Sequence, residues 1–524
     1  MTSFQLRKPY TAEELAQLYP KELELQLVQI VYWPYCNSAR QLTSVVMATA
    51  DWSRWDSLKY RRRIETFGFD DRPVIASGPN GEFDAVCQPG ELTDKGRETT
   101  LALGSRLRHL YINQLHFMPR LIADSDMIYL RATPIPRALE SVQQAFWGLY
   151  PASTRTADFP APTIITRTPA DETLFPNDGN CRRFAHLSRA FAARAAQRWN
   201  DTDEMHYLSQ LFSKWMPGHS RVAVDSHPRL SGIMDTINST DAHGPATKLP
   251  PEFYDAKARG IIDRISVEEW YAGYNESAEY RTLGIGALMG DIVSRMTGSV
   301  ERNGNDGAVE VGGVDEDLEH RRGGEMEVRF ALSGCHDTTL AGALTSLGAF
   351  GGESWPPFTS HIAFELFRRK NGGGVMDGTN ISPGEGEGLG RRSASTSAED
   401  EDAKQRADAP SQGWWASLLG SSNNTAPPSP SPKSIARKHV STLSPSQRQS
   451  LQNHYVRIRY NDKVMQVPGC KLEGKHLPGD PTFCTLEAFK SIVDSYTPKN
   501  WKHSCASNID APSFPEKPEM AGYE

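Results

Sequence analysis

The sequence lacks any long apolar run. None of its 524 residues lie in a stretch of about 18 consecutive apolar residues, so no membrane-spanning helix is predicted. Positive charge is not in surplus either: 57 Lys and Arg face 64 Asp and Glu, a formal net charge of −7, which excludes the basic surface typical of nucleic-acid-binding proteins. Residues 1–20 show neither an apolar leader nor an Arg-rich stretch. We therefore expect a cytoplasmic protein.

Cysteine is scarce and unclustered. A CxxC spacing is absent, which argues against a zinc ribbon, and the odd number argues against a dense disulfide framework. One late pair, Cys470 with Cys484, stays open. The sequence also lacks HExxH and any paired Cys and His at ligand spacing, so no metal site is expected. The seven cysteines are Cys36, Cys87, Cys181, Cys335, Cys470, Cys484 and Cys505.

Strand-like and helix-like segments alternate from residue 21 to about residue 300, which is typical of an α/β protein. Within this part, 181–199 and 266–296 have helical periodicity and predict a mostly helical cap. The predicted organisation is an N-terminal arm at 1–20, an α/β core at 21–160, 326–370 and 450–500, a cap at 161–300 and a tail at 501–524.

Two segments have the composition of disordered loops. Residues 301–325 are Gly-rich and charged, and 371–449 are rich in Gly, Ser, Pro and acidic residues. The second segment separates the strand-like stretches 361–369 and 454–461, which we expect to pair as a hairpin. It contains one apolar motif that offers a docking site for a partner, although an ordinary linker is the simpler interpretation: Trp414, Trp415, Leu418 and Leu419.

The stretch EVRFALSGCHDTTLAGALTSLG, residues 327–348, carries the clearest chemical signal. It reads as a strand, a Ser-Gly-Cys turn and a helix, which places His336 and Asp337 at the end of the strand and the start of the helix. Ligands of open α/β sheets bind at this edge, and helix N-termini favour anions. An imidazole beside a carboxylic acid suits phosphoryl chemistry. Asp337 as a plain helix cap, with His336 packed against it, is an equally good interpretation of this stretch alone.

A second strand, turn and helix occurs in YLRATPIPRALES, residues 129–141, with Arg131 and Arg137 on either side of the turn. An arginine at a helix N-terminus opposes the helix dipole, whereas a phosphate bound between the two would pair with its guanidinium. This favours an anion site, with surface salt bridges as the alternative.

The HDTTL element, the R-x-T-x-x-x-R segment and the helix LTDKGRETTLALGSRLRHLY resemble the acid-phosphatase and phytase branch of the histidine phosphatase superfamily. The resemblance covers roughly 21–300 and 326–500. Without an N-terminal leader, the chain is most similar to the intracellular or mitochondrial lysophosphatidic-acid-phosphatase type of fungal sequences, which makes a mitochondrial location the alternative. It implies an α/β fold with a phosphoglycerate-mutase-like central sheet flanked by helices, a mostly α cap, and metal-independent hydrolysis of phosphomonoesters without a cofactor.

The resemblance also assigns residues. In this family the first strand ends in Arg-His-Gly-x-Arg-x-Pro, whose His attacks phosphorus and forms a phosphohistidine. Arg137 matches the phosphate-binding Arg that follows the second strand, His336 the second His of the phosphate pocket, and Asp337 the proton donor. Arg131 is a further predicted substrate-binding residue.

The nucleophile motif itself is missing. The apolar strand that ends at Val31 continues directly into Tyr32-Trp33-Pro34-Tyr35-Cys36, and neither His109 nor His186, both in helical stretches, has the flanking residues to replace it. The residues after the break are similar to the family's own continuation. We interpret this as a short segment lost between Val31 and Tyr32 by a skipped exon or a misplaced intron boundary.

Two functions follow from this reading. The first is a phosphomonoesterase family member that is nearly inactive because its nucleophile is absent. The second is a pseudophosphatase that acts as a binding or scaffold protein. A phosphoglycerate-mutase-like transferase shares the chemistry but not this motif set. The class of substrate and the oligomeric state stay open.

Overall fold

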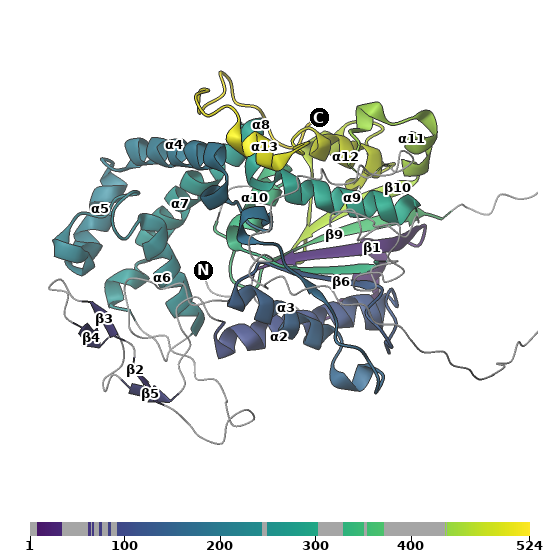
Figure 1. Ribbon diagram of the computed structural model, residues 1–524, viewed down its shortest axis with the longest axis horizontal. Coiled ribbons are helices and arrows are strands. Elements are labelled where there is room, and N and C mark those ends of the chain that lie inside the picture. Colours follow the sequence, from purple (N-terminus) through teal and green to yellow (C-terminus); the bar gives the residue numbers. More distant parts are fainter. Residues whose placement is uncertain are drawn as a thin grey trace, which may run out of the picture. The chain divides into compact units, whose positions relative to one another are not determined.

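The computed structural model describes residues 8–33, 92–243, 249–301, 328–350, 354–370, 435 and 437–524, together with four short strands between 61 and 84 (Figure 1). The chain divides into two compact units, 1–370 with 430–524 and 371–429, and all described residues belong to the first. Of the predicted loop 301–325, Glu301 is the last residue of a helix, and 302–325 lie outside the described residues. The predicted docking motif at 414–419 also lies outside them.

A nine-stranded sheet forms the centre of this unit. Its strand order is β12-β13-β10-β9-β1-β8-β6-β7, with β11 paired to β10. The apolar stretch predicted as the first strand is β1, and it lies inside the sheet between β9 and β8. A nearly continuous apolar run is typical of such a strand when both faces of the sheet are covered. The strands are β1 (Leu23–Tyr32), β6 (Ile128–Ala132), β7 (Ile164–Ile165), β8 (Phe330–Gly334), β9 (His361–Arg369), β10 (His454–Tyr460), β11 (Lys463–Met465), β12 (His476–Leu477) and β13 (Asp480–Thr485).

The two halves of the sheet differ in strand direction. Strand β1 runs parallel to β8, and β8 runs parallel to β6, whereas β9 is antiparallel to β1 and to β10. The antiparallel pairing of β9 with β10 confirms the predicted hairpin of 361–369 with 454–461. Two further pairs are separate from this sheet: β2 (Arg61–Arg63) with β5 (Glu82–Asp84), and β3 (Glu65–Phe67) with β4 (Pro73–Ile75).

Helices cover both faces of the sheet, and a separate hydrophobic core lies on each face. Figure 1 shows α2 (Asp94–Leu107) and α3 (Pro136–Leu149) side by side on one face. Gly104 makes their close approach feasible, since a Cβ there would lie 2.0 Å from the backbone oxygen of Ala145. The opposite face carries α9 (Ala287–Glu301), α10 (Asp337–Ser346) and α12 (Leu486–Asp494). This arrangement confirms the predicted α/β class with a central sheet flanked by helices.

Helical segments beyond the sheet form the part predicted as a cap. The helical stretches expected at 181–199 and 266–296 are present as α4, the second half of α7, α8 and α9. The bounds are α4 (Arg182–Trp199), α5 (Asp203–Phe212), α6 (Leu230–His243), α7 (Ala256–Glu276) and α8 (Ala278–Arg281), and Figure 1 shows α4 to α7 together beside one end of the sheet. The remaining helices are α1 (Ala12–Leu18), α11 (Pro445–Leu451) and α13 (Trp501–Ala506). The exact domain boundaries stay a prediction.

The end of the predicted insert 371–449 is ordered. Val440 and Leu443 are buried in the core on the α9 face, and α11 begins at Pro445 with Ser444 as its cap. The composition of 371–449 misled the prediction here because a few apolar residues in a Ser- and Pro-rich segment are enough to dock it. The part of the insert before Ile435 lies outside the described residues.

A buried charge network stabilises the antiparallel half of the sheet. Glu365 on β9 is fully buried and accepts hydrogen bonds from Tyr19 at 2.7 Å, from Tyr111 at 2.8 Å and from Arg457 at 2.9 Å, and it forms an ion pair with Arg459 at 3.2 Å. Burial alone would raise the pKa of Glu365, but the two arginines hold it at about 2.

Two disulfides link described residues. Cys470–Cys484, left open by the sequence, is formed, and Cys181–Cys505 joins residues 324 apart. Among the described cysteines Cys335 is free and buried. Disulfides are more typical of chains that mature in an oxidising compartment than of cytosolic ones, so the cytoplasmic location remains a prediction. None of the described helices is both long and apolar enough to cross a membrane.

Candidate active site

Three parallel strands end at the same level of the sheet. Tyr32 at the end of β1 and Ala132 at the end of β6 are both in register with Gly334 at the end of β8. Backbone hydrogen bonds continue the alignment, from Cys335 to the oxygen of Tyr32 at 2.8 Å and from Thr133 to the oxygen of Gly334 at 3.2 Å. The segments that leave these strands therefore meet at one edge, where ligands of α/β sheets bind.

His336 lies at this edge, as predicted. It is itself the N-cap residue of α10, so the alternative interpretation of Asp337 as the helix cap was wrong. The backbone N–H of His336 donates to the Thr339 hydroxyl at 3.3 Å, and its Nε2 lies 3.2 Å from the Thr133 hydroxyl. The Phe175 ring meets the imidazole edge to face, with 5.6 Å between the ring centres. Burial, with a smaller effect of the Arg137 charge, lowers the pKa of His336 to about 3. The imidazole is therefore neutral over most of the acidic range.

Asp337 is the first residue of α10 and is partly exposed. Its Oδ1 accepts the backbone N–H of Thr338 at 2.8 Å, and its Oδ2 accepts the indole N–H of Trp355 at 2.7 Å. Burial raises the pKa of this carboxyl against the opposing effect of these hydrogen bonds. A carboxyl that holds its proton to a higher pH than usual is suited to give that proton to a leaving group.

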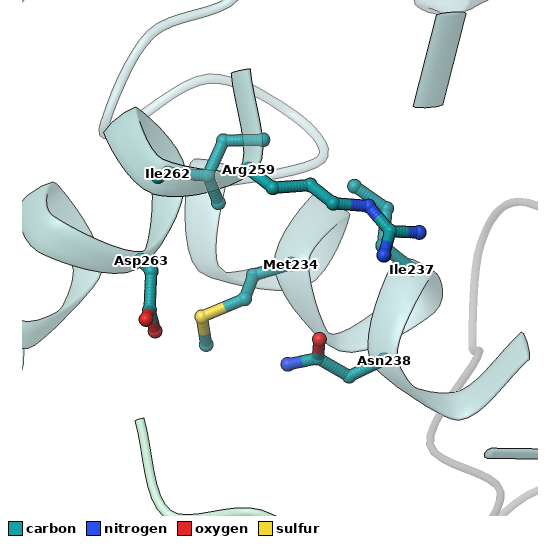
Figure 2. Close-up of a pocket in the computed structure, with 7 residues that line it drawn as sticks. Met234, Ile237, Asn238, Arg259, Ile262 and Asp263 are labelled. Atoms are coloured by element: carbon teal, nitrogen blue, oxygen red, sulfur yellow. The ribbon is translucent and has the colours of Figure 1, made fainter. Parts of the chain in front are cut away.

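Trp355 connects Asp337 to a second carboxylate. Its backbone N–H donates to Oδ1 of Asp263 on α7 at 2.8 Å, and burial raises the pKa of Asp263. Asp263 borders a cavity of about 140 Å³ between α6 and α7 (Figure 2), which is also lined by Met234, Ile237, Asn238, Arg259, Gly260 and Ile262. Trp355 therefore fixes the position of the loop before β9 relative to both α7 and α10.

Arg137 is the second residue of α3, directly after Pro136 in the first helical position. Its positive charge lowers the pKa of both His336 and Asp337, which places its guanidinium near the two side chains. The structure thus brings together three of the four site residues that the sequence predicted. The N-termini of α3 and α10 meet at the same place, and both favour an anion there.

Arg131 contacts none of these three residues in the hydrogen bonds that follow, and its partners are different side chains. Its side chain is 1% exposed, and it donates to Glu172 at 2.8 Å, to Thr173 at 3.0 Å and to Asp291 on α9 at 3.4 Å. These contacts favour a structural role in a buried ion-pair cluster. Substrate binding by Arg131 stays a prediction without support from this geometry.

The end of β1 and the residue after it carry two aromatic side chains, Tyr32 and Trp33. The Tyr32 hydroxyl is buried 3.4 Å from the Ser141 hydroxyl, and Trp33 donates its backbone N–H to Ser360 at 3.0 Å while its ring packs on Phe358 at 4.5 Å. The following residues, from Pro34, lie outside the described part of the chain.

Cys335 is the one thiol beside the site among the described residues. Its Sγ lies 3.1 Å from the backbone oxygen of Tyr32, and burial raises the pKa of the thiol strongly. A thiol that keeps its proton is a poor nucleophile. Within the described residues, no three His, Cys, Asp or Glu side chains are grouped so that they would hold a metal ion.

Sequence reasoning missed two neighbours of the site. Thr133 contacts His336, and Trp355 holds Asp337. Thr133 belongs to the R-x-T-x-x-x-R segment and had a signal in its position directly after a strand. Trp355 had none, since it comes from an irregular segment 18 residues after Asp337.

Known proteins resemble this chain in sequence over most of its length. The profile of the histidine phosphatase superfamily (branch 2) matches residues 51–379. A probable acid phosphatase of Schizosaccharomyces pombe is 32% identical over 507 residues, which cover 93% of this chain and 95% of that protein. Lysophosphatidic acid phosphatase type 6 of Homo sapiens is 23% identical over 283 residues, which cover 53% of this chain and 57% of that protein.

Among solved structures, a Hafnia alvei phytase in complex with tartrate is similar with a TM-score of 0.49 at 11% identity, over 93% of this chain and 99% of the phytase. The sequence matches are decisive for the family. Because the profile covers more than half of the chain and the Schizosaccharomyces pombe protein aligns with nearly all of it, the chain belongs, as its motifs predicted, to branch 2 of the histidine phosphatase superfamily.

Proposed function

We propose that the chain binds the phosphoryl group of a phosphomonoester between Arg137 and His336, with Asp337 as the proton donor to the leaving alcohol. Arg137 supplies the positive charge and a fork of N–H donors for the phosphate oxygens. Neutral His336 offers one ring N–H to the same group. In the family's reaction the nucleophilic His bonds to phosphorus as the P–O ester bond breaks, the alcohol takes the acid's proton, and water then releases phosphate.

One observation carries this proposal: the Arg137 charge acts on both His336 and Asp337 at a point where two helix N-termini converge. If these residues served only to cap α10, the positive charge of Arg137 at the N-terminus of α3 would be unfavourable, because it opposes the helix dipole. A bound dianion removes the conflict. Asp337 is held as an acid by burial and oriented by Trp355, which suits a proton donor.

We further propose that this chain binds such substrates with almost no turnover. The first displacement requires a nucleophile after β1, and the sequence there supplies Tyr32 and Trp33, whose side chains are buried in the core. The missing motif would also have supplied two phosphate-binding arginines, so binding rests mainly on Arg137. Loss of the nucleophile removes the covalent step.

Calorimetric titration with inorganic phosphate and with orthovanadate tests the binding. We expect both anions to bind the chain, and Arg137→Ala to weaken binding by about tenfold or more, because charged hydrogen bonds to phosphate are lost. Arg120→Ala, at an exposed arginine, is the matched control and should bind like the unaltered chain. Absence of binding, or binding that survives Arg137→Ala unchanged, contradicts the proposal.

The alternative is a pseudophosphatase, in which binding itself is the function. It shares the phosphate site but predicts that every transcript joins the codons of Val31 and Tyr32 directly. A full-length cDNA read across these codons separates the two. An Arg-His-Gly-x-Arg-x-Pro segment in the transcript supports a working phosphatase, and its absence supports the binding protein.

A further inference from the structure

The segment before β9 has few backbone donors that could hold it in place. Trp355 is followed by Pro356 and Pro357, and a proline carries no backbone N–H. Across these three residues the N–H of Trp355 is therefore the single backbone donor, and it donates to Oδ1 of Asp263 at 2.8 Å. A side chain of α7, 92 residues earlier in the chain, thus binds the backbone of this segment.

The Trp355 side chain is buried between α7 and the start of α10. It is 5% exposed, and its ring centre lies 5.1 Å from that of Tyr271 and 6.1 Å from that of Trp270, both on α7. Its indole N–H donates to Oδ2 of Asp337 at 2.7 Å. A ring that packs against two others keeps its orientation, so a shift of the Trp355 backbone would carry the indole N–H away from the carboxyl.

The Asp337 carboxyl is oriented by two hydrogen bonds of different origin. Its Oδ1 accepts the backbone N–H of Thr338, which α10 itself holds in place. Its Oδ2 accepts the indole N–H of Trp355, which belongs to a different segment. The direction in which this acid faces therefore depends on Trp355. That direction matters for a proton donor, because the donor must face the oxygen that receives the proton.

Asp263 itself makes few contacts. Among the described residues, Trp355 alone donates a hydrogen bond to it. Arg259, about one turn earlier on α7, pairs with Asp241 at 2.6 Å instead. Burial raises the pKa of Asp263, so the fold disfavours its charged form. Figure 2 shows its carboxylate extending away from α7 beside Met234. The bond to Trp355 is therefore the contact through which Asp263 acts.

We propose that Asp263 is a positioning residue for the proton donor: its carboxylate holds the backbone of Trp355, and the Trp355 indole in turn keeps the Asp337 carboxyl in its orientation. The inference rests on the proposed function, in which Asp337 gives its proton to the leaving alcohol. It gives helix α7 a part in the reaction although Asp263 is not one of the phosphate-binding residues.

The pKa of Asp337, measured by NMR of labelled aspartate in the full chain, tests the inference. Asp263→Ala removes the acceptor and should raise this pKa about as much as Trp355→Phe does, because the indole donor that lowers it is displaced. The double variant should show no further rise. A direct effect of the lost charge has the opposite sign, since removing a negative charge lowers the pKa of a nearby carboxyl. Asp263→Asn keeps an acceptor oxygen for the Trp355 N–H and should not raise the pKa.

Asp241→Ala is the matched control. Asp241 is a largely buried carboxylate of α6 that pairs with Arg259 on α7, and its printed partner is not Trp355. Its loss weakens the contact between the same two helices and should leave the pKa of Asp337 unchanged. If Asp263→Ala does not fold, Asp263→Ser takes its place with the same expectation, because the shorter side chain stops short of the Trp355 N–H.

An unchanged or lowered pKa in Asp263→Ala overturns the inference. A rise in the double variant beyond that of Trp355→Phe overturns it too, as does an equal rise in Asp241→Ala. Inorganic phosphate, titrated calorimetrically, should bind Asp263→Ala within about twofold of the unaltered chain, and a far larger loss would show that Asp263 supports the whole phosphate site instead. Phosphate binding that is absent or independent of Arg137 defeats the proposed function itself. The two failures are distinguishable, because the NMR measurement is made without phosphate.

Discussion

The neutral state of His336 makes the fold sensitive to acid in a calculable way. Burial and Arg137 hold the pKa of His336 at about 3 in the folded chain, against 6.5 for an ordinary histidine. Between pH 3 and pH 6.5 the imidazole of His336 is therefore mostly protonated in the unfolded chain and mostly neutral in the folded chain. The contribution of His336 to the free energy of unfolding is therefore complete above about pH 6.5 and is lost as the pH falls towards 3.

The size of this loss follows from the pKa difference. At about 1.4 kcal/mol for each pH unit, the full loss has an upper limit of about 5 kcal/mol, and the part lost between pH 7 and pH 5 is about 2 kcal/mol. His336→Asn removes the titrating group while keeping a side chain that is favoured at the N-cap of a helix. We therefore expect the variant to lose about 2 kcal/mol less than the unaltered chain over this interval.

Urea unfolding followed by tryptophan fluorescence at pH 7 and pH 5 measures the difference. His206→Asn, at an exposed histidine of α5, is the matched control and should follow the unaltered chain at both pH values. Equal losses in His336→Asn and in the unaltered chain would refute the reasoning, because they would show that His336 takes up its proton as readily folded as unfolded.

Three further predictions concern other parts of the structure. Trp355→Phe removes the indole donor that lowers the pKa of Asp337, so this pKa should rise further. The carboxyl signal of labelled aspartate in NMR measures the pKa, and an unchanged value argues against the hydrogen bond. Glu365→Gln leaves two buried arginines without their carboxylate and should cost about 3–5 kcal/mol in urea unfolding, whereas a loss below 1 kcal/mol would show that the network is not stabilising. Replacing Cys470 and Cys484 together by Ser opens a loop of about 15 residues and should cost about 3 kcal/mol, and no effect of the exchange under oxidising conditions would mean that the bond does not form.

The sequence predicted the site best where the signal was local. The strand, turn and helix around His336 and Asp337 follow from the alternation of apolar residues, the glycine and the threonines that begin the helix. The same is true of Arg137, since Pro136 marks the start of α3. In each case a few neighbouring residues determine both the element and the end of the element at which the side chain lies.

The missed features depend on distant partners. The alternation along β6 does not reveal that Arg131 faces Glu172 and Asp291, which are 41 and 160 residues away. Trp355 lies in a segment without periodicity, so its bond to Asp337 has no local sign.

Hydrolysis of p-nitrophenyl phosphate tests the central claim, that this site is a phosphatase site without its nucleophile. The assay compares the chain as it is with a chain that carries an Arg-His-Gly-x-Arg-x-Pro segment between Val31 and Tyr32. The account predicts almost no turnover for the first and clear turnover for the second, which His336→Ala or Asp337→Ala then cripples. Turnover by the unaltered chain at a rate comparable to that of the chain with the segment would contradict it, and so would undiminished rates in the two alanine variants.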